Sequence, residues 1–296
     1  MTYVIETKSL TKKFPNKLAV DRINMHVSAG DIYGLIGRNG AGKTTAMKMI
    51  LGILTPTEGS IELFGSQSLG TERRRIGSLI ETPGIYKNCS AFENMKRFAY
   101  VSGGDDDKIR ELLAFVGLGD VGNRKAGTFS LGMKQRLGIA IALLGDPEVL
   151  ILDEPINGLD PAGIKEIRDM ILKLNHDKGV TFLISSHLLD ELGKIATTYG
   201  IINNGELVEE ISAEELARRC RKGIRISVKD LRTAEELLRA NGYTDLTVEG
   251  SQIILHNEVQ HSAEINELLV RGGVSVSELS ILNEGLEDYF IKRLGK

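Results

Sequence analysis

The stretch Gly37-Arg38-Asn39-Gly40-Ala41-Gly42-Lys43-Thr44-Thr45 directly follows an apolar run at positions 31–36. It has the Gly-x-x-x-x-Gly-Lys-Thr spacing of a phosphate-binding loop, with a predicted strand before it and a predicted helix after it. Glycines let the backbone fold back so that several N–H groups converge on an anion, at a helix N-terminus whose dipole favours negative charge. The sequence therefore predicts a nucleoside triphosphate site, formed by Asn39, Gly40, Ala41, Gly42, Lys43, Thr44 and Thr45.

Three side chains of this loop have distinct expected roles. Lys43 reaches the β- and γ-phosphates, and the hydroxyl of Thr44 binds Mg²⁺. Thr45 is available for the α-phosphate. The expected ligand is therefore a nucleoside triphosphate with its magnesium ion.

The composition is that of an ordinary globular protein. The chain has 296 residues, of which 42% are hydrophobic and 26% charged, and its formal net charge is -3. Because it carries no basic stripe, we expect no nucleic-acid partner. Cys89 and Cys220 lie in unrelated contexts, so they suggest neither a metal cluster nor a disulfide framework.

The sequence also predicts where the protein works. Positions 1–10 lack the apolar core of a signal peptide, and the most apolar stretch, 137–144, is too short to span a bilayer. We therefore expect a protein in the cytoplasm that would reach a membrane only through a partner.

Apolar periodicity divides the chain after the loop into strands and helices. The spacing is helical from about 84 to 146, which predicts a helical subdomain inserted between strands. Runs typical of strands are found at 3–7, 19–27, 31–37, 59–65, 76–80, 149–155, 180–184, 200–203 and 206–210. This alternation predicts an α/β fold with a mostly parallel sheet flanked by helices.

Two of the predicted central strands end in polar groups. The run Val149-Leu150-Ile151-Leu152 leads into Asp153 and Glu154, and the run 180–184 leads into Ser185-Ser186-His187. Ligands bind at the carboxyl ends of strands in open α/β sheets, so these groups are expected beside the phosphate loop. A lone histidine is more often structural than catalytic, but His187 at this position is a better candidate than most.

The pattern restarts after about residue 223. Positions 212–296 contain a first helix to about Arg221, then a β-α-β-β-α-β order, and a tail helix from Glu284 to Leu294. This order predicts a small ferredoxin-like domain following a first domain of residues 1–211. It contains no site chemistry that we can identify, and packing is its simplest role.

Taken together, the ordered motifs resemble the ATP-binding subunits of ABC transporters over about residues 3–210. The matching pieces are GRNGAGKTT, FSLGMKQR, VLILDEP, the NGLD segment at Asn157 to Asp160, and His187 after a strand. The resemblance implies a P-loop ABC cassette with a RecA-like sheet core and an inserted helical subdomain, followed by the small α+β module. It also implies ATP and Mg²⁺ as cofactors.

The resemblance further implies roles for individual residues. Asp153 holds Mg²⁺, Glu154 polarises the attacking water, and His187 contacts the γ-phosphate. Phe14 could be simple packing on sequence grounds alone, but the resemblance favours stacking on adenine. The remaining nucleotide contacts implied by the family are Val20, Asp160, and Ser130 and Gly132 of a second subunit in a head-to-tail dimer.

The sequence departs from the family pattern at two places. Leu131 and Met133 replace a glycine and the glutamine of the usual signature, while Ser130 and Gly132 remain. Glu81 stands where the family has a glutamine that senses the metal and the attacking water. We therefore expect Glu81 to contact the metal and to take part in catalysis. A carboxylate about 5 Å from phosphate charge would be repelled by about 3 kcal/mol at an effective dielectric near 20, unless Mg²⁺ offsets it.

Glu81, its context LIETPGIYKNCSAFENM and the C-terminal module resemble the subgroup that exports bacitracin and lantibiotics for self-protection. This resemblance implies an integral membrane permease as partner and a homodimer or pseudo-dimer of ATP-binding subunits. It also implies a peripheral location on the inner face of the cell membrane.

Three alternatives were weighed. A non-transport ABC ATPase acting on ribosomes or DNA usually has a second cassette or a long coiled coil, and neither is present. A GTPase would need an Asn-Lys-x-Asp segment, whereas Asn16-Lys17-Leu18-Ala19 lacks the aspartate. A binding module without turnover would not need Glu154 and His187.

Overall fold

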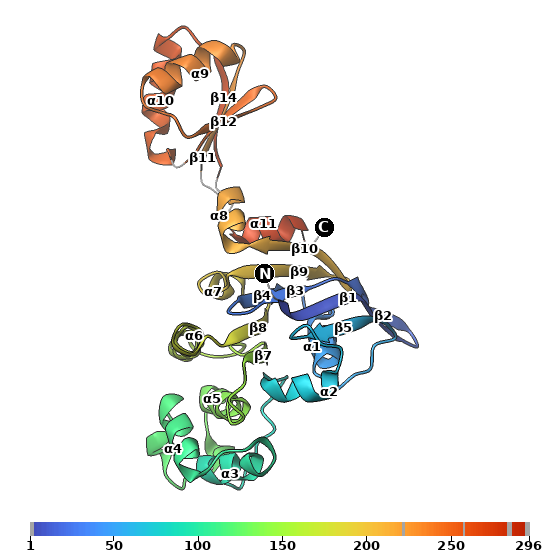
Figure 1. Cartoon of the computed structure of the whole chain (residues 1–296). Helices are drawn as coiled ribbons and strands as arrows, with labels where there is room; N and C mark the ends of the chain where they lie inside the picture. The colour runs from blue at the N-terminus through green and yellow to red at the C-terminus, as the bar shows by residue number, and fades with distance from the viewer. Residues whose placement is uncertain (1–2, 221–222, 257, 283–285, 294–296) are drawn as a thin grey trace. The chain divides into compact units, whose positions relative to one another are not determined.

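The structure is a computed structural model that describes residues 3–220, 223–256, 258–282 and 286–293. The chain divides into two compact units, the first comprising residues 1–213 with 293–296 and the second residues 214–292. Each unit is described by itself (Figure 1).

The centre of the first unit is a six-stranded sheet in the order β10-β9-β4-β8-β7-β6. All neighbouring pairs are parallel except β10 with β9. The three middle strands, β4, β8 and β7, are buried along their whole length, as expected for strands covered on both faces. The strands are β4 (Ile32–Ile36), β6 (Ile76–Leu79), β7 (Val149–Asp153), β8 (Thr181–Ser186), β9 (Thr198–Asn203) and β10 (Glu206–Ser212).

The register of this sheet aligns the ends that carry the polar groups. Ile36 at the end of β4 is paired with Ser186, and Asp153 at the end of β7 is paired with Ser185. The carboxyl ends of the three strands are therefore level, which brings the loop after β4 to the same edge as the carboxylates after β7.

The N-terminal strands form a second, antiparallel sheet. Strand β1 pairs with β2, β3 and β5. The predicted strand 19–27 is in fact two strands, because Asn24 interrupts it and its Oδ1 accepts a hydrogen bond from the N–H of Ser9 at 2.8 Å. The strands are β1 (Tyr3–Phe14), β2 (Lys17–Ile23), β3 (His26–Ser28) and β5 (Glu58–Leu63).

The helical segment predicted near 84–146 contains three helices. Ser90 and Glu93 form a reciprocal capping box that begins α3, and Asp105 caps α4 through the N–H of Lys108. The helices of the first unit are α1 (Lys43–Ile50), α2 (Leu69–Glu72), α3 (Ala91–Ser102), α4 (Asp106–Phe115), α5 (Leu131–Ala142), α6 (Pro161–Lys178) and α7 (Leu189–Leu192). Short 3-10 turns lie at η1 (Arg73–Arg75), η2 (Gly119–Val121) and η3 (Ala126–Thr128).

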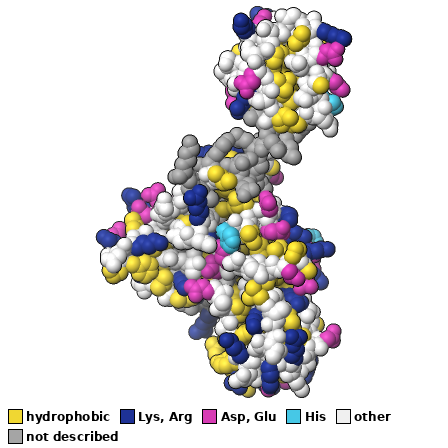
Figure 2. Space-filling view, turned by 180° about the vertical axis from the view of Figure 1, so that it is seen from behind, with side chains coloured by type: hydrophobic (Ala, Val, Ile, Leu, Met, Phe, Trp, Pro, Cys, Tyr) yellow, Lys and Arg dark blue, Asp and Glu magenta, His cyan; other side chains and the backbone are white. Residues whose placement is uncertain are grey.

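Helix α1 packs into the core between the two sheets. Its residues Met47, Met49 and Ile50 are completely buried in a cluster that also contains side chains of β1, β4 and β7. The phosphate loop is therefore fixed between two well-packed elements, β4 and α1. On the face of the first unit seen in Figure 2, Lys and Arg side chains are interspersed with Asp and Glu side chains.

The second unit has a four-stranded antiparallel sheet in the order β12-β13-β11-β14. In the core of this unit, helices α9 and α10 pack against the sheet. Leu238 of α9 and Leu269 of α10, for example, belong to the same hydrophobic cluster as Ile226 of β11. The elements after β10 are α8 (Ala213–Arg219), β11 (Gly223–Val228), α9 (Leu231–Ala240), β12 (Leu246–Glu249), β13 (Gln252–His256), η4 (Val259–His261), α10 (Ser262–Arg271), β14 (Val276–Leu282) and α11 (Leu286–Arg293). Arg221 and both predicted ends of the tail helix, Glu284 and Leu294, lie outside the described residues.

Candidate nucleotide-binding site

The phosphate loop lies between β4 and α1, and its glycines are required by close packing. Gly42 caps α1 in a left-handed conformation, with φ of 116°. A Cβ atom at Gly42 would lie 2.6 Å from the carbonyl oxygen of Ala19, and one at Gly37 would lie 2.4 Å from that of Ile202. The N–H of Gly205 also donates to the carbonyl of Ala41 at 2.9 Å. The loop is therefore held by the backbones of β2 and of the β9–β10 turn.

The loop borders a cavity of about 170 Å³. This cavity brings together six predicted residues of the phosphate loop and one predicted residue from a distant part of the sequence. They are Asn39, Gly40, Gly42, Lys43, Thr44 and Thr45, joined by the catalytic candidate Glu154, and the lining is completed by Lys17 and Ala19.

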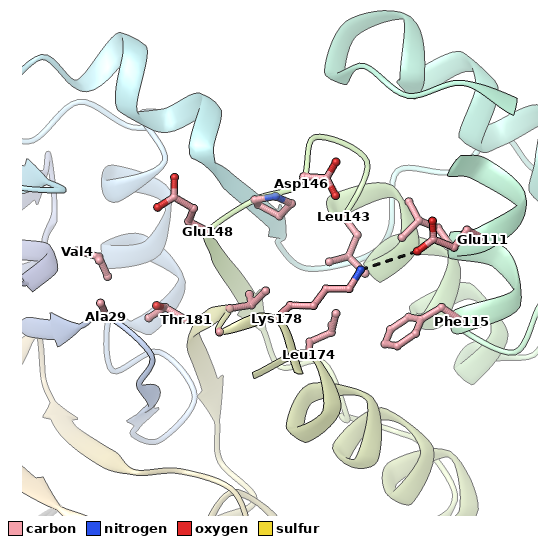
Figure 3. Close-up of a pocket in the computed structure, with 14 residues that line it drawn as sticks. Val4, Ala29, Glu111, Phe115, Leu143, Asp146, Glu148, Leu174, Lys178 and Thr181 are labelled. Atoms are coloured by element: carbon pink, nitrogen blue, oxygen red, sulfur yellow. Dashed lines mark ion pairs between the residues drawn. The ribbon is translucent and has the colours of Figure 1, made fainter. Parts of the chain in front are cut away.

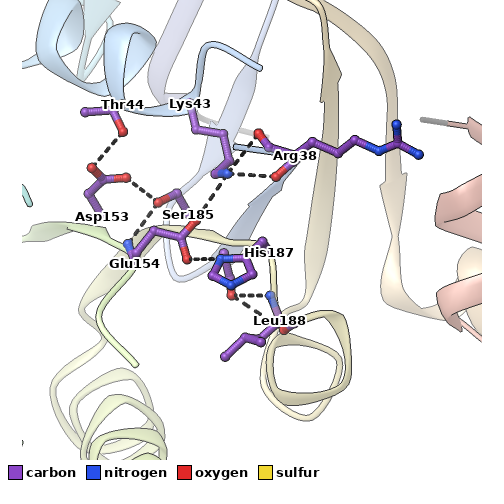
Figure 4. Close-up of polar contacts among 10 residues, drawn as sticks. Arg38, Lys43, Thr44, Asp153, Glu154, Ser185, His187 and Leu188 are labelled. Carbon is purple, nitrogen blue, oxygen red and sulfur yellow. Dashed lines mark hydrogen bonds and ion pairs between the residues drawn. The ribbon is translucent and has the colours of Figure 1, made fainter. Parts of the chain in front are cut away.

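The ammonium group of Lys43 is buried within its own loop. Its Nζ donates to the carbonyl oxygen of Gly37 at 2.7 Å and lies 3.1 Å from Oε1 of Glu154 (Figure 4). The Lys43 side chain is only 5% exposed. A buried cation bound to a carbonyl and a carboxylate can exchange these partners for phosphate oxygens, which carry negative charge as the carboxylate does and are stronger acceptors than the carbonyl.

Asp153 is held in place by two hydroxyl groups. Thr44 Oγ1 donates to Oδ2 of Asp153 at 2.8 Å, and Ser185 Oγ donates to Oδ1 (Figure 4). A hydroxyl and a carboxylate are hard oxygen donors that suit Mg²⁺, which is usually bound by one or two protein oxygens together with substrate phosphates and water. The described residues contain no cluster of three or more His, Cys, Asp or Glu side chains suited to a metal. A metal at this site would therefore depend on the phosphates.

Glu154 follows β7 in a left-handed conformation, with φ of 50°. Its N–H donates to Ser185 Oγ at 3.0 Å, and its Oε2 lies 2.8 Å from Nδ1 of His187. The other oxygen, Oε1, is buried and makes no hydrogen bond, although it touches Lys43. Departure of Lys43 would therefore free one carboxylate oxygen at the cavity wall, where a general base would have to be.

His187 lies directly after β8 and is partly exposed, at 33% of its side chain. The turn that holds it is fixed because Ser186 Oγ accepts the N–H of Leu188 at 2.9 Å. In Figure 4 the imidazole points toward Glu154. The predicted histidine and the predicted acid are therefore in contact, although the two are 33 positions apart.

The N-terminal hairpin differs from the sequence-based assignment. Phe14 is 38% exposed, does not line the cavity, and has Nζ of Lys12 at 5.4 Å from its ring centroid. Val20 is completely buried in the hydrophobic core, so the geometry does not support its assignment as a nucleotide contact. Neighbouring residues of a strand point to opposite faces, and it is Ala19 that lines the cavity.

Sequence reasoning missed Lys17. Its Nζ lies at the cavity, 3.3 Å from the carbonyl oxygen of Gly40, to which it donates a hydrogen bond. The turn that joins β1 to β2 brings Lys17 over the loop. No local sequence signal distinguishes it from the other exposed lysines of this hairpin.

Three further predicted residues do not line the cavity. Two of them cap the N-termini of helices, and the third lies in the first turn of one of these helices. Ser130 begins α5, and its Oγ accepts the N–H of Met133 at 3.2 Å. Asp160 begins α6, and its Oδ1 accepts the N–H of Gly163 at 3.0 Å. Gly132 lies in the first turn of α5.

Glu81 lies just after β6 and also has a left-handed backbone, with φ of 60°. Its Oε1 is 2.6 Å from Nζ of Lys48 on α1, and its side chain is 61% exposed. Glu81 does not line the phosphate-loop cavity.

A larger cavity, of about 380 Å³, lies at the opposite edge of the sheet, near the amino ends of β7 and β8. Glu111 of α4 and Lys178 of α6 face each other across it, with Oε1 and Nζ 3.9 Å apart (Figure 3). The phosphate loop does not line this cavity. We therefore assign the nucleotide site to the smaller cavity beside the loop.

The fold and the site define a P-loop nucleotide-binding protein. Residues 20–157 match the protein family described as "ABC transporter". Over its whole length the chain is 45% identical to the bacitracin transport ATP-binding protein BcrA of Enterococcus faecalis, covering 97% of that protein. It is 44% identical, over 70% of its length, to the lantibiotic transport ATP-binding protein SrtF of Streptococcus pyogenes, covering 90% of that protein.

Solved structures agree with this assignment. The chain resembles cbiO1 of Clostridium perfringens, with a TM-score of 0.66 and 26% identity over 74% of this chain and 92% of that one. It also resembles MJ1267, an ATP-binding cassette of an ABC transporter, with a TM-score of 0.67 and 27% identity over 74% and 95% of the two chains.

The chain therefore belongs to the ATP-binding proteins of ABC transporters. It has the α/β cassette fold predicted from its motifs, binds ATP, and is an ATPase of the transport type. Within the parts of the chain that the structure describes, no helix is both long and apolar enough to cross a membrane.

Proposed function

We propose that this chain powers an exporter that removes a bacitracin-like peptide antibiotic from the cell envelope. The observation that supports this most is the extent of the similarity to the bacitracin transport protein, which covers 100% of this chain. The similarity to the lantibiotic transport protein covers only 70%. Bacitracin is thus favoured over a lantibiotic as the class of cargo.

The geometry supports a separate role for each of the site residues. Lys43 leaves the carbonyl of Gly37 and Glu154 and binds the β- and γ-phosphates. Glu154, released from Lys43, accepts a proton from the attacking water through Oε1, while His187 holds Oε2 and reaches toward the γ-phosphate. Thr44 and Asp153 would hold Mg²⁺, which would offset negative charge on the triphosphate.

The site also needs a second subunit in this proposal. Ser130 and Gly132 of one copy would contact the γ-phosphate held by the loop of the other. The Ser130 hydroxyl suits this role, because its oxygen already accepts the Met133 N–H and its O–H is left to donate. ATP bound between two copies would stabilise the dimer, and hydrolysis would release it.

A membrane permease is the proposed partner, which would place the protein at the inner face of the membrane. Helix α3 exposes apolar side chains, with Tyr100 82% and Val101 91% exposed. Val101 also borders a cavity of about 710 Å³ that extends to Phe98 and α5. Exposed apolar groups beside a hollow are typical of a protein interface.

The test is expression of the chain together with its permease in an antibiotic-sensitive host, followed by measurement of the inhibitory concentrations of bacitracin and of a lantibiotic. We expect the inhibitory concentration of bacitracin to rise, and the rise to be lost in the Glu154→Gln variant. Unchanged sensitivity with both proteins present at the membrane would contradict the proposal. Protection against the lantibiotic alone would contradict the assignment of the cargo.

A further inference from the structure

Glu81 is a carboxylate outside the phosphate-loop cavity that pairs with the helix following the phosphate loop. Among the residues that the structure describes, this carboxylate pairs with Lys48, with Oε1 and Nζ 2.6 Å apart. Glu81 lies two residues after the end of β6, while Lys48 is on α1, so the pair links the segment that follows the parallel sheet to the helix that begins in the phosphate loop.

Lys48 has a definite position relative to the metal candidates. It follows Thr44 by four residues on α1, so the two side chains lie on the same face of the helix, one turn apart. Thr44 in turn donates to Asp153. Lys48 therefore carries its charge about one helical turn from the hydroxyl that would bind Mg²⁺, and Glu81 is held beside it.

The backbone of Glu81 limits where its carboxylate can go. Its left-handed φ of 60° is uncommon for a residue with a side chain and fixes the direction of the Cα–Cβ bond. An ion pair as exposed as this one is weak enough to open when a stronger cation is present.

We propose that Lys48 is a positioning residue that neutralises Glu81 and holds it away from the triphosphate until Mg²⁺ is bound. The inference deepens the proposed function and rests on it, because it assigns Glu81 to the metal side of the same ATP site. Lys48 removes the repulsion that Glu81 would otherwise exert on the phosphates.

The test is a double-mutant cycle on ATP affinity, measured by calorimetry on the full-length chain, once with Mg²⁺ and once with EDTA. Without Mg²⁺ nothing but Lys48 offsets Glu81, so Lys48→Gln should weaken ATP binding about threefold to fivefold, the range of an exposed ion pair. In the Glu81→Gln background the same substitution should have little effect. With Mg²⁺ present, the loss of ATP affinity caused by Lys48→Gln in the wild-type background should be smaller than in EDTA.

Two controls separate this role from a general loss of charge or of structure. Lys48→Arg keeps the pair and should restore the wild-type affinity. Lys108→Gln removes a lysine that pairs with Asp146 at 2.7 Å away from the cavity, and it should leave ATP binding unchanged.

Equal effects of Lys48→Gln in both backgrounds would overturn the inference, since Lys48 would then attract the phosphates directly. A failure of Lys48→Arg to restore affinity would also overturn it. These results differ from a failure of the proposed function, in which antibiotic sensitivity would not change although the chain binds ATP.

Discussion

Nδ1 of His187 lies 2.8 Å from Oε2 of Glu154, so the residue after one buried strand directly contacts the residue after the next. On its other side the same carboxylate meets Lys43. Glu154 is thus held between an imidazole and the ammonium that would bind phosphate. The exchange of Lys43 from Glu154 to a phosphate would leave the carboxylate free to act on water.

Glu154→Gln should nearly abolish ATP turnover while ATP binding is retained. The amide keeps the shape of the side chain but cannot accept a proton, and general base catalysis contributes about 10²–10⁴-fold to rate. Phosphate release and ATP affinity would be measured in parallel, and the variant should form a stable dimer in ATP and Mg²⁺ on size-exclusion chromatography. Glu166→Gln, outside the cavity, is the control. A variant that turns over near the wild-type rate would remove Glu154 from this role.

His187→Ala should lower kcat by about 10²-fold with little change in ATP affinity. The imidazole orients Glu154 and faces the position expected for the γ-phosphate, and both effects act on the chemical step more than on binding. Steady-state kinetics would separate kcat from KM. His176, which is 89% exposed on α6, offers a matched control, and His176→Ala should be silent. A loss confined to KM would assign His187 to binding alone.

Lys17→Ala should weaken ATP binding by about tenfold, the lower end of the range for a hydrogen bond to a charged group. Lys17 lies at the cavity and donates a hydrogen bond to a carbonyl oxygen of the loop. Calorimetry at low and high salt would measure the effect, which should decrease with salt. Lys13→Ala removes a neighbouring exposed lysine that does not line the cavity. Equal losses from both substitutions would show only a general effect of charge.

Ile226→Ala should destabilise the second unit by about 2–5 kcal/mol and leave ATP binding intact. Ile226 is completely buried in the core of that unit, so its truncation leaves a cavity there. Calorimetric unfolding with and without ATP would show which transition shifts. Ile281→Ala, at a side chain that is 56% exposed, should cost far less. Loss of the ATP-induced shift in Ile226→Ala would mean that the two units do not fold separately.

The ion pair of Glu148 with Arg75 should stabilise the protein at neutral pH and should no longer do so in acid, where Glu148 is protonated. A hydrogen bond from Arg75, at 2.7 Å, lowers the pKa of Glu148 below its ordinary value near 4.3. A lowered pKa in the folded state means that the contribution is fully present above about pH 4.3 and is lost as pH falls through the lower folded value. Because Glu148 is 58% exposed, the contribution is at most about 1 kcal/mol.

Urea unfolding of the wild type and of Glu148→Gln between pH 3 and 7 would check this. The difference in free energy of unfolding should be present at pH 6 and should shrink below about pH 4.3. A difference that stays constant over this range would contradict the assigned pKa shift.

The sequence was sufficient for those features that depend on local spacing. The phosphate loop, the acid strand and the histidine after the next strand were all predicted, because each is a short motif at the end of an apolar run. The register of the sheet then brings Thr44 and Asp153 into contact, as the order of strands in such a fold requires.

Features that depend on tertiary contacts were not predicted. Lys17 reaches the cavity because of how one hairpin turns, and Lys48 pairs with Glu81 across 33 residues. Whether Ala19 or Val20 lines the cavity depends on which face of β2 each side chain occupies, and the sequence pattern alone does not fix that face. The break at Asn24 was hidden because the apolar residues on both sides continue the same pattern.

The left-handed backbone of Glu154 has a consequence for protein engineering. A φ of 50° is unfavourable for glutamate by about 1 kcal/mol or more, whereas glycine and asparagine accept it readily. Stability and activity are therefore opposed at this one position. A search for thermostable variants would favour glycine or asparagine at 154 and would discard the side chain on which turnover depends.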